Sequence, residues 1–282
     1  MLESSFLQLP GISENTERSL WNQGIRHWND LRAAAPDIFG NKKAQKCLLA
    51  LEESRVALEA REFSFFQQRL GNAHAWRMIP FCEKSIAYLD IETTGLGFPP
   101  ASHSTSIAVS FRGELFLEHD QTKKKNLLKK LHDEVQMWVT FNGLCFDLPF
   151  LRRETGLAFS HAHVDLRVWF NRLGLRGGLK KIQMQFPEIP SRDSMDIDGF
   201  DAVRLWRLHE QGVAGALETL LTYNAEDTLV LETLLTLAWN LQMEAFGNLG
   251  HSALEKREFP KTPQIPTQID NDVYRRLRGR ES

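Results

Sequence analysis

The chain has 282 residues, of which 42% are hydrophobic and 25% are charged, and its formal net charge is -2. This length and composition fit one large domain, or one medium-sized domain with an appendage, and they are sufficient for a hydrophobic core. The net charge excludes a polycation that coats nucleic acid over its whole surface, so any attraction to phosphate must come from local basic patches.

The N-terminal part of the chain, residues 1–62, is predicted to be a helical segment. Gly11, Ser13 and Gly24 punctuate its beginning, and Asn41–Glu62 places leucines and a valine among charged residues. The aromatic run Phe63–Phe66 is expected to be a connector that packs on a following domain.

The beginning of this helical segment resembles a helix-hairpin-helix element. Gly11 and Ile12 occupy its turn, where backbone N–H groups would contact a DNA phosphate. Ser13 stands where a second glycine is usual, and Glu14 and Glu17 bring negative charge to the expected phosphate position. A helical hairpin used for packing or protein contact is the alternative.

The middle of the chain, residues 63–248, is predicted to form an α/β domain. Three successive strands are expected over Ser85–Ile91, Ser104–Phe111 and Glu114–His119. Gly/Pro-containing or Arg-Gly breaks separate them, so they are expected to form a meander. A helix over Leu127–Val135 and a fourth strand over Met137–Phe141 follow.

A further helix is predicted after Leu148-Pro149, and a fifth strand over Ala162–Leu166. Residues 167–246 have a helical pattern with Gly and Pro interruptions, and residues 249–282 read as an extended basic tail. Strands first, then strands alternating with helices, predict a mixed five-stranded sheet flanked by helices.

Four acidic residues interrupt apolar stretches of this domain, where a carboxylate is costly unless positive charge compensates it. Asp90 and Glu92 are two residues apart on a strand, so their side chains leave the same face. Asp147 follows the end of another strand. Tyr223 and Asp227 have the i, i+4 spacing that places them on one helix face.

Such a cluster suits two-metal phosphoryl transfer, since hard divalent cations prefer oxygen ligands. Asp90 is the candidate bridge between two ions. Glu92 and Asp227 would complete the ligand shell of the water-activating ion, and Asp147 would serve the second ion directly or through water. Tyr223 would orient the attacking water, because its ordinary pKa near 10 suits a donor better than a base.

Taken singly, these signals have ordinary structural readings. An Asp-x-Glu at a strand end is usually a solvated turn, and Asp147 before a proline can be a helix N-cap. Asp227 could begin a helical turn, and Tyr223 could be a core aromatic. The ordered conjunction of the stretches favours function.

The three stretches resemble the exonuclease motifs of the DEDD superfamily of 3′–5′ exonucleases, which have the ribonuclease H-like fold. Asp90-Ile91-Glu92-Thr93 is similar to the first motif, and residues 142–149 closely resemble the second motif of family B DNA polymerase proofreading domains. Tyr223-x-x-x-Asp227 fits the tyrosine variant of the third. Over roughly residues 65–240, the pattern is most similar to YprB-type ribonuclease H-like proteins of bacteria.

The resemblance implies two Mg²⁺ or Mn²⁺ ions and stepwise release of nucleoside 5′-monophosphates from a nucleic-acid 3′ end. Asn142 is expected to contact the terminal nucleotide or brace Asp147, and Thr93 to contact substrate. Asp165 is read as a helix cap. The N-terminal segment favours DNA slightly over RNA. The alternative is a catalytically silent nucleic-acid-binding module with the same fold.

Three widely spaced cysteines form neither a zinc pattern nor a disulfide framework: Cys47, Cys82 and Cys145. The chain has no recognisable secretory signal and no apolar stretch of membrane-spanning length. A cytoplasmic protein without a membrane partner is therefore expected, and protein partners are unknown. Basic runs at Lys123–Lys130 and Arg275–Arg280 are either phosphate-attracting patches or solvated surface.

Overall fold

The computed structural model describes the whole chain except residues 190–191, 193, 195, 248–254, 262–263 and 280–282. The chain packs as two compact units. Unit 1 comprises residues 1–83 and 160–163, and unit 2 comprises residues 84–159 and 164–282. The division expected from the sequence, into residues 1–62, 63–248 and 249–282, stays a prediction.

Unit 1 is largely helical, as predicted for the N-terminal segment. Its helical elements are η1 (Leu2–Ser4), α1 (Glu14–Asn22), α2 (Trp28–Ile38), α3 (Asn41–Glu59), α4 (Phe63–His74), η2 (Ala75–Met78), α5 (Ile79–Cys82) and the first residue of η3 (Glu83–Ser85). The expected connector at Phe63–Phe66 is wrong, because these residues begin α4. Phe63, Phe66 and Leu70 are buried at the three- and four-residue spacing of an inward-facing helical stripe.

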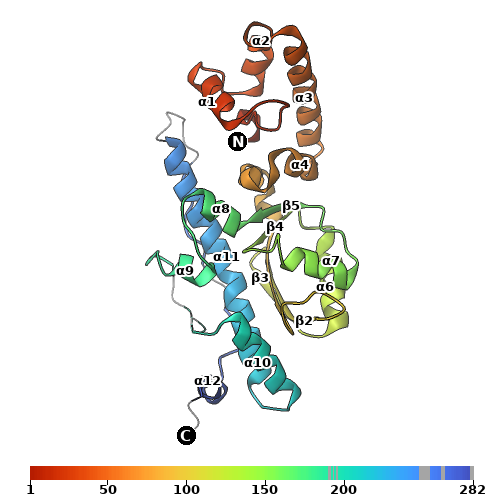
Figure 1. Ribbon diagram of the computed structural model, residues 1–282, viewed down its shortest axis with the longest axis vertical. Helices are drawn as coiled ribbons and strands as arrows, with labels where there is room; N and C mark the ends of the chain where they lie inside the picture. Colours follow the sequence, from red (N-terminus) through yellow and green to blue (C-terminus); the bar gives the residue numbers. More distant parts are fainter. Residues whose placement is uncertain (190–191, 193, 195, 248–254, 262–263, 280–282) are drawn as a thin grey trace. The chain divides into compact units, whose positions relative to one another are not determined.

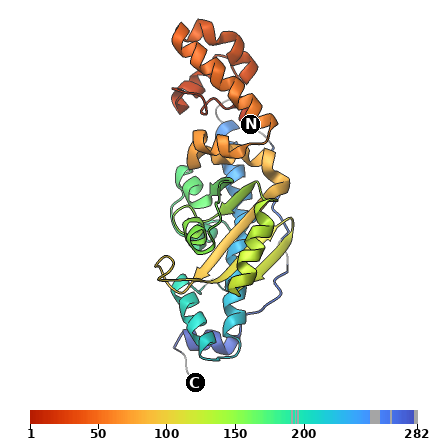
Figure 2. The same cartoon turned by 90° about the vertical axis from the view of Figure 1, so that its right-hand side faces the viewer.

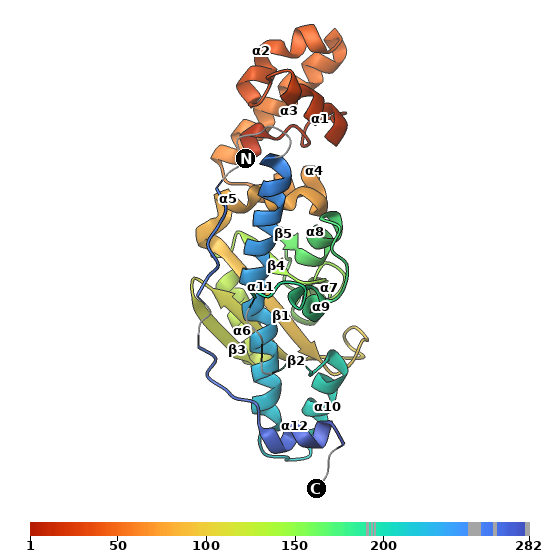
Figure 3. The ribbon, with the colours of Figure 1, turned by 90° about the vertical axis from the view of Figure 1, so that its left-hand side faces the viewer.

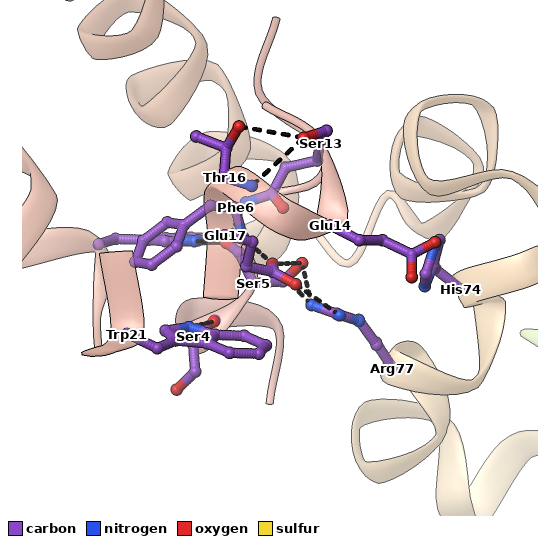
Figure 4. Close-up of polar contacts among 12 residues, drawn as sticks. Ser4, Ser5, Phe6, Ser13, Glu14, Thr16, Glu17, Trp21, His74 and Arg77 are labelled. Atoms are coloured by element: carbon purple, nitrogen blue, oxygen red, sulfur yellow. Dashed lines mark hydrogen bonds and ion pairs between the residues drawn. The ribbon is translucent and has the colours of Figure 1, made fainter. Parts of the chain in front are cut away.

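A buried ion pair within unit 1 joins Glu17 of α1 to Arg77 of η2 (Figure 4). Two nitrogens of the Arg77 guanidinium donate to the two Glu17 carboxylate oxygens at 2.8 and 2.7 Å. The backbone N–H of Phe6 donates to the same carboxylate at 2.6 Å, and Arg77 also donates to the Ser5 hydroxyl at 2.8 Å. Glu17 is therefore a satisfied internal group, and the expectation that it brings charge to a phosphate position is wrong.

Unit 2 contains a mixed five-stranded sheet in the order β3-β2-β1-β4-β5. The strands are β1 (Ile86–Thr93), β2 (Ser104–Phe111), β3 (Glu114–Glu118), β4 (Met137–Thr140) and β5 (Ala162–Asp165), the last beginning with residues assigned to unit 1. β1 pairs antiparallel with β2 and parallel with β4, and β2 pairs antiparallel with β3. The predicted fold class and the predicted meander are confirmed.

The helices of unit 2 are α6 (Gln121–His132), α7 (Asp147–Thr155), α8 (Leu166–Arg172), α9 (Leu179–Gln183), α10 (Gly199–Glu210), α11 (Ala216–Gly247) and α12 (Asn271–Leu277), and several of them flank the sheet. α6 begins six residues before the predicted Leu127, because the Asp120 side chain accepts the Lys123 N–H at 2.9 Å as an N-cap. α12 lies in the tail expected to be extended. There Asp270 caps the helix, accepting the Val273 N–H at 3.0 Å.

The two faces of the sheet have different coverings, which fixes where polar side chains of β1 point. Leu89 and Ile91 pack in one hydrophobic cluster with Leu128 of α6 and Phe150 of α7. Alternate residues of a strand point to opposite faces, so Asp90 and Glu92 point toward the long helix α11. Figures 1 and 3 show α11 crossing the sheet, and Figure 2 shows α6 on the opposite side.

In the described part of the chain, no helix is both long enough and apolar enough to cross a membrane.

Candidate metal centre

Three of the predicted carboxylates meet between β1 and α11. Asp90, Glu92 and Asp227 each offer an oxygen, and these oxygens lie within 4.8 Å of one another. Glu92 and Asp227 are buried, and Asp90 is half-buried. Asp90 and Glu92 lie on the same face of β1, and Asp227 lies on the helix that covers this face. The fold thus brings together Glu92 and Asp227, which are 135 residues apart in sequence.

Asp147 is the first residue of α7 and lies beside this group. Its carboxylate accepts the Ile91 N–H at 3.3 Å, between Asp90 and Glu92 on β1. Phe146 is the N-cap of the helix, so the reading of Asp147 as an N-cap residue does not hold. Asp147 is 5% exposed, and its negative charge acts on both Asp90 and Glu92.

The four carboxylates do not share equal electrostatic surroundings. Burial, followed by the charges of Glu92, Asp147 and Asp227, raises the pKa of Asp90 well above its ordinary value. Burial and the charges of Asp227 and Asp147 raise the pKa of Glu92 in the same way. Burial raises the pKa of Asp147 to about 7. Ionising the whole cluster therefore requires positive charge nearby.

Two cations that sequence reasoning missed face the cluster. Arg192 forms a buried ion pair with Asp227. The Lys180 ammonium lies 4.9 Å from the centre of the Tyr223 ring and donates to the Ser194 carbonyl at 2.9 Å. The positive charge of Lys180 partly offsets the rise in the pKa of Glu92. Neither residue has a sequence spacing that points to the acidic stretches, since only the folded chain brings them there.

Tyr223 is both a core residue and a neighbour of the carboxylates. It is 5% exposed and belongs to a hydrophobic cluster with Leu205 and Leu220. Burial, and then the charges of Asp227, Glu92 and Asp90, raise the pKa of its hydroxyl far above the ordinary value. The hydroxyl is therefore protonated at neutral pH and can act as a donor.

Asn224 is a further residue of the cluster that sequence reasoning missed. Its amide nitrogen donates to Asp90 at 2.7 Å, and its amide oxygen accepts from the Ser106 hydroxyl of β2 at 2.9 Å. This side chain is fully buried and orients Asp90. The sequence does contain a signal for this residue, because Asn224 precedes Asp227 by three residues and so lies on the same face of the helix.

Thr93 and Asn142, two of the four residues expected to contact substrate, lie in unit 2 and have defined partners there. The Thr93 hydroxyl donates to the Gly95 carbonyl at 2.8 Å. The Asn142 side chain accepts from Arg167 at 2.9 Å, and no bond from Asn142 to Asp147 occurs among the described residues. The expected bracing of Asp147 is thus not seen there.

Asp165 organises the turn that contains Asn142. One carboxylate oxygen accepts the N–H groups of Asn142 and Arg167 at 2.9 and 3.0 Å, and the other accepts the Leu144 N–H at 3.0 Å. The interpretation of Asp165 as the cap of α8 is confirmed.

Gly11 and Ile12 belong to unit 1. Gly11 has a left-handed φ of +73°, as a tight turn requires, and its carbonyl accepts from Lys43 at 3.2 Å. Ile12 is 8% exposed, so its side chain is a core group. Ser13 caps α1 by accepting the Thr16 N–H at 3.2 Å, as Figure 4 shows.

The donor set of the cluster fits a divalent metal ion. Carboxylate oxygens are the ligands that hard divalent cations prefer, and the pKa values of Asp90 and Glu92 stay raised by burial and by the neighbouring carboxylates although Lys180 lies nearby. Asp90, Glu92 and Asp227 are placed to hold such an ion, with Asp147 alongside.

Comparison with known proteins agrees with this fold. Residues 87–239 match the RNase H superfamily. This span begins at the second residue of β1, contains the other four strands and includes the acidic residues described above. A search of curated proteins found no match. The chain belongs to the RNase H superfamily, and this membership indicates a nuclease-type, nucleic-acid-processing hydrolase.

Proposed function

We propose that this protein is a metal-dependent 3′–5′ exonuclease of the DEDD superfamily, tyrosine subtype, with DNA slightly favoured over RNA as substrate. The observation that carries the proposal is the meeting of Asp90, Glu92 and Asp227 oxygens within 4.8 Å. Asp147 and Tyr223 lie beside them, as the exonuclease motifs of that superfamily would require.

In this proposal, Asp90, Glu92, Asp147 and Asp227 hold two Mg²⁺ or Mn²⁺ ions. When bound, such ions lower the pKa of water and neutralise the charge that develops on the attacked phosphate. Asn224 keeps Asp90 in place through its 2.7 Å hydrogen bond. The folded chain thereby sets the orientation of the carboxylate assigned as the bridge.

The protonated Tyr223 hydroxyl serves as a hydrogen-bond donor that orients the attacking water. Its raised pKa argues against a role as general base. Lys180 and Arg192 bring positive charge to the side of the cluster formed by Asp227 and Glu92. Thr93 and Asn142 are assigned to the terminal nucleotide.

Unit 1 is assigned a separate, accessory contact. The left-handed turn at Gly11 and the beginning of α1 resemble a phosphate-contacting hairpin, so the backbone of Gly11 and Ile12 would contact a nucleic-acid phosphate. This contact would supply affinity without sequence preference.

The test is a degradation assay on 5′-labelled DNA and RNA with Mn²⁺ or Mg²⁺. The wild type should shorten linear strands in a ladder and spare a circular single strand, which has no 3′ end. Asp90→Asn should abolish the ladder. Asp133→Asn, which alters an exposed carboxylate at the end of α6, is the matched control and should leave the ladder intact.

A thermal measurement separates an inactive enzyme from a silent binding module. Mn²⁺ should raise the melting temperature of the wild type, because an ion that binds the folded state stabilises it. Asp90→Asn should lose most of this gain. Inertness of wild type and variant alike on every substrate would favour the catalytically silent, nucleic-acid-binding alternative.

A further inference from the structure

A cavity of about 820 Å³ in unit 2 lies outside the carboxylate cluster. Its wall comes from four segments: the β1–β2 loop, the β3–α6 junction, the end of α7, and α10. Figures 2 and 3 show the β1–β2 loop beside α10. The wall residues that matter here are His103, His119, Gln121, Arg153, Glu154 and Trp206. The volume is within the usual range for a small-molecule site.

The cavity is tied directly to the strand that carries Asp90 and Glu92. The Thr94 N–H donates to the His103 carbonyl at 3.0 Å, and the His103 N–H donates to the Thr94 hydroxyl at 3.2 Å. Thr94 is two residues beyond Glu92. From strand rise and strand separation, the His103 backbone lies roughly 8 Å from that of Glu92. The distance suits neighbouring positions of one bound strand.

Planar and cationic side chains line this cavity. The Trp206 ring lies 6.2 Å from the His103 ring and 5.2 Å from the His209 ring. The exposed Arg153 guanidinium lies 4.2 Å from the centre of the Phe98 ring. Aromatic rings and guanidinium planes are the surfaces on which unpaired bases stack. Arg153 also offers donors for a phosphate.

The carboxylates of the wall are engaged with the protein itself. Glu154 accepts the N–H and the hydroxyl of Ser104 at 2.7 and 2.6 Å. The buried Lys124 ammonium donates to the Ser104 carbonyl and to its hydroxyl, which places a cation beside Glu154. Asp120 caps α6. These contacts reduce the repulsion that a phosphate would meet.

We propose that this cavity binds a nucleotide of the substrate strand upstream of the scissile bond, and that it selects single-stranded 3′ ends. The base would stack against Trp206 and the phosphate would pair with Arg153. A paired base keeps its faces inside the duplex stack, so only an unpaired base can use this wall. The inference rests on the proposed exonuclease function for the direction of the strand.

The direct test measures binding without cleavage. Asp90→Asn protein and a 5′-fluorescent single-stranded DNA are titrated by fluorescence anisotropy, with a blunt duplex of the same sequence in parallel. Adding Arg153→Ala or Trp206→Ala should weaken single-strand binding about 10-fold and reduce the preference over duplex. Arg152→Ala is the matched control, because Arg152 is an exposed neighbour on α7 outside the cavity wall.

A second measurement assigns the contact to a base. Strands with one abasic position, moved stepwise from the 3′ end, should lose affinity at one position, and Trp206→Ala should add little further loss there. Trp206 packs against a buried cluster, so each variant is checked by its melting temperature, and Trp206→Phe keeps a ring at that position. Arg153→Ala tests the cavity independently of that packing.

The outcomes separate this inference from the proposed function. Unchanged DNA affinity in folded Arg153→Ala and Trp206→Ala protein overturns the cavity assignment, even if the wild type degrades 3′ ends. That result would favour a peptide as the occupant of the cavity. Loss of affinity at the abasic-sensitive position supports the cavity assignment. If that loss occurs while the wild type, with Asp90 intact, degrades none of the substrates, the exonuclease proposal fails and the nucleotide site stands.

Discussion

The two units bury charge in opposite ways. In unit 1, Glu17 and Arg77 are 1% and 3% exposed, and they form a bidentate pair whose charges cancel. In unit 2, Asp90, Glu92, Asp147 and Asp227 lie together with Lys180 and Arg192 nearby, and the pKa values of Asp90, Glu92 and Asp147 are raised. A matched pair is part of the structure of its unit, whereas four carboxylates beside two cations indicate a ligand that brings further positive charge.

The largest expected effect is on the matched pair. Glu17→Gln leaves Arg77 buried with an incomplete partner, which should lower the free energy of unfolding of unit 1 by about 3–5 kcal/mol. Amide hydrogen exchange of α1, recorded at increasing urea concentration, measures this free energy of unfolding. Glu52→Gln, in an exposed ion pair with Arg32, is the control and should cost less than about 1 kcal/mol.

The cost of an unpaired buried charge can be separated from the loss of the ion pair itself. The double variant Glu17→Leu/Arg77→Met should recover much of the stability lost in Glu17→Gln, because apolar groups can replace a buried ion pair. Equal stability of Glu17→Gln and wild type would show that the pair is not the structural element inferred here.

Asn224→Ala should reduce metal affinity or nuclease activity about 10- to 100-fold, because the residue that orients a ligand is removed while the ligand stays. The hydrogen bonds from Asn224 to Asp90 and from Ser106 to Asn224 are both lost. Mn²⁺ titration by calorimetry measures the affinity. Thr233→Ala, a change farther along α11, is a control, and an equal loss there would point to a general effect on the helix.

Arg192→Gln should strengthen Mn²⁺ binding about 5-fold, a magnitude typical of coupled sites. Arg192 pairs with Asp227, so its guanidinium competes with any cation that uses this carboxylate. Calorimetry in the absence of nucleic acid isolates the effect. Weaker Mn²⁺ binding would mean that Arg192 holds Asp227 in its ligand position instead.

A further effect is expected on the pH dependence of stability. In the folded protein the pKa of Asp147 is raised to about 7, so the folded state holds this proton more tightly than the unfolded chain does. The resulting stability is present below the unfolded pKa of about 4 and is lost as pH rises through 7. Urea unfolding in EDTA should therefore show lower stability at pH 8 than at pH 5.

Asp147→Asn should reduce this pH dependence, and Asp133→Asn should not. The raised pKa values of Asp90 and Glu92 account for the part that remains. Mn²⁺ should restore stability to the wild type at pH 8, because its positive charge favours the ionised carboxylates. A wild-type protein with the same stability at both pH values would contradict the raised pKa.

Local sequence pattern predicts the sheet well. The limits predicted for Ser104–Phe111 agree with β2, because β-branched residues and Gly/Pro-containing breaks carry local information. The same reasoning missed α4 at Phe63, where adjacent aromatic residues obscure a helical stripe. It also missed α12, which is a single short helix in a segment with several prolines.

The candidate site was predictable only in part. Asp90 and Glu92 follow from strand periodicity, and Tyr223 and Asp227 follow from helix periodicity. Lys180 and Arg192 could not be predicted in this way, because their place beside Asp227 depends on how the chain returns after α8. Asn224 was accessible through its helix face, but its hydrogen bond to Asp90 depends on the docking of α11 on β1.

Because Tyr223, Asn224 and Asp227 all lie on α11, insertions and deletions before Tyr223 act on all three residues at once. One residue inserted within the first turns of α11 would rotate every later residue by about 100° relative to the beginning of the helix. An insertion of seven residues would return them to within about 20° of their original face. The length of this helix before Tyr223 is thus as much a part of the site as the identity of its side chains.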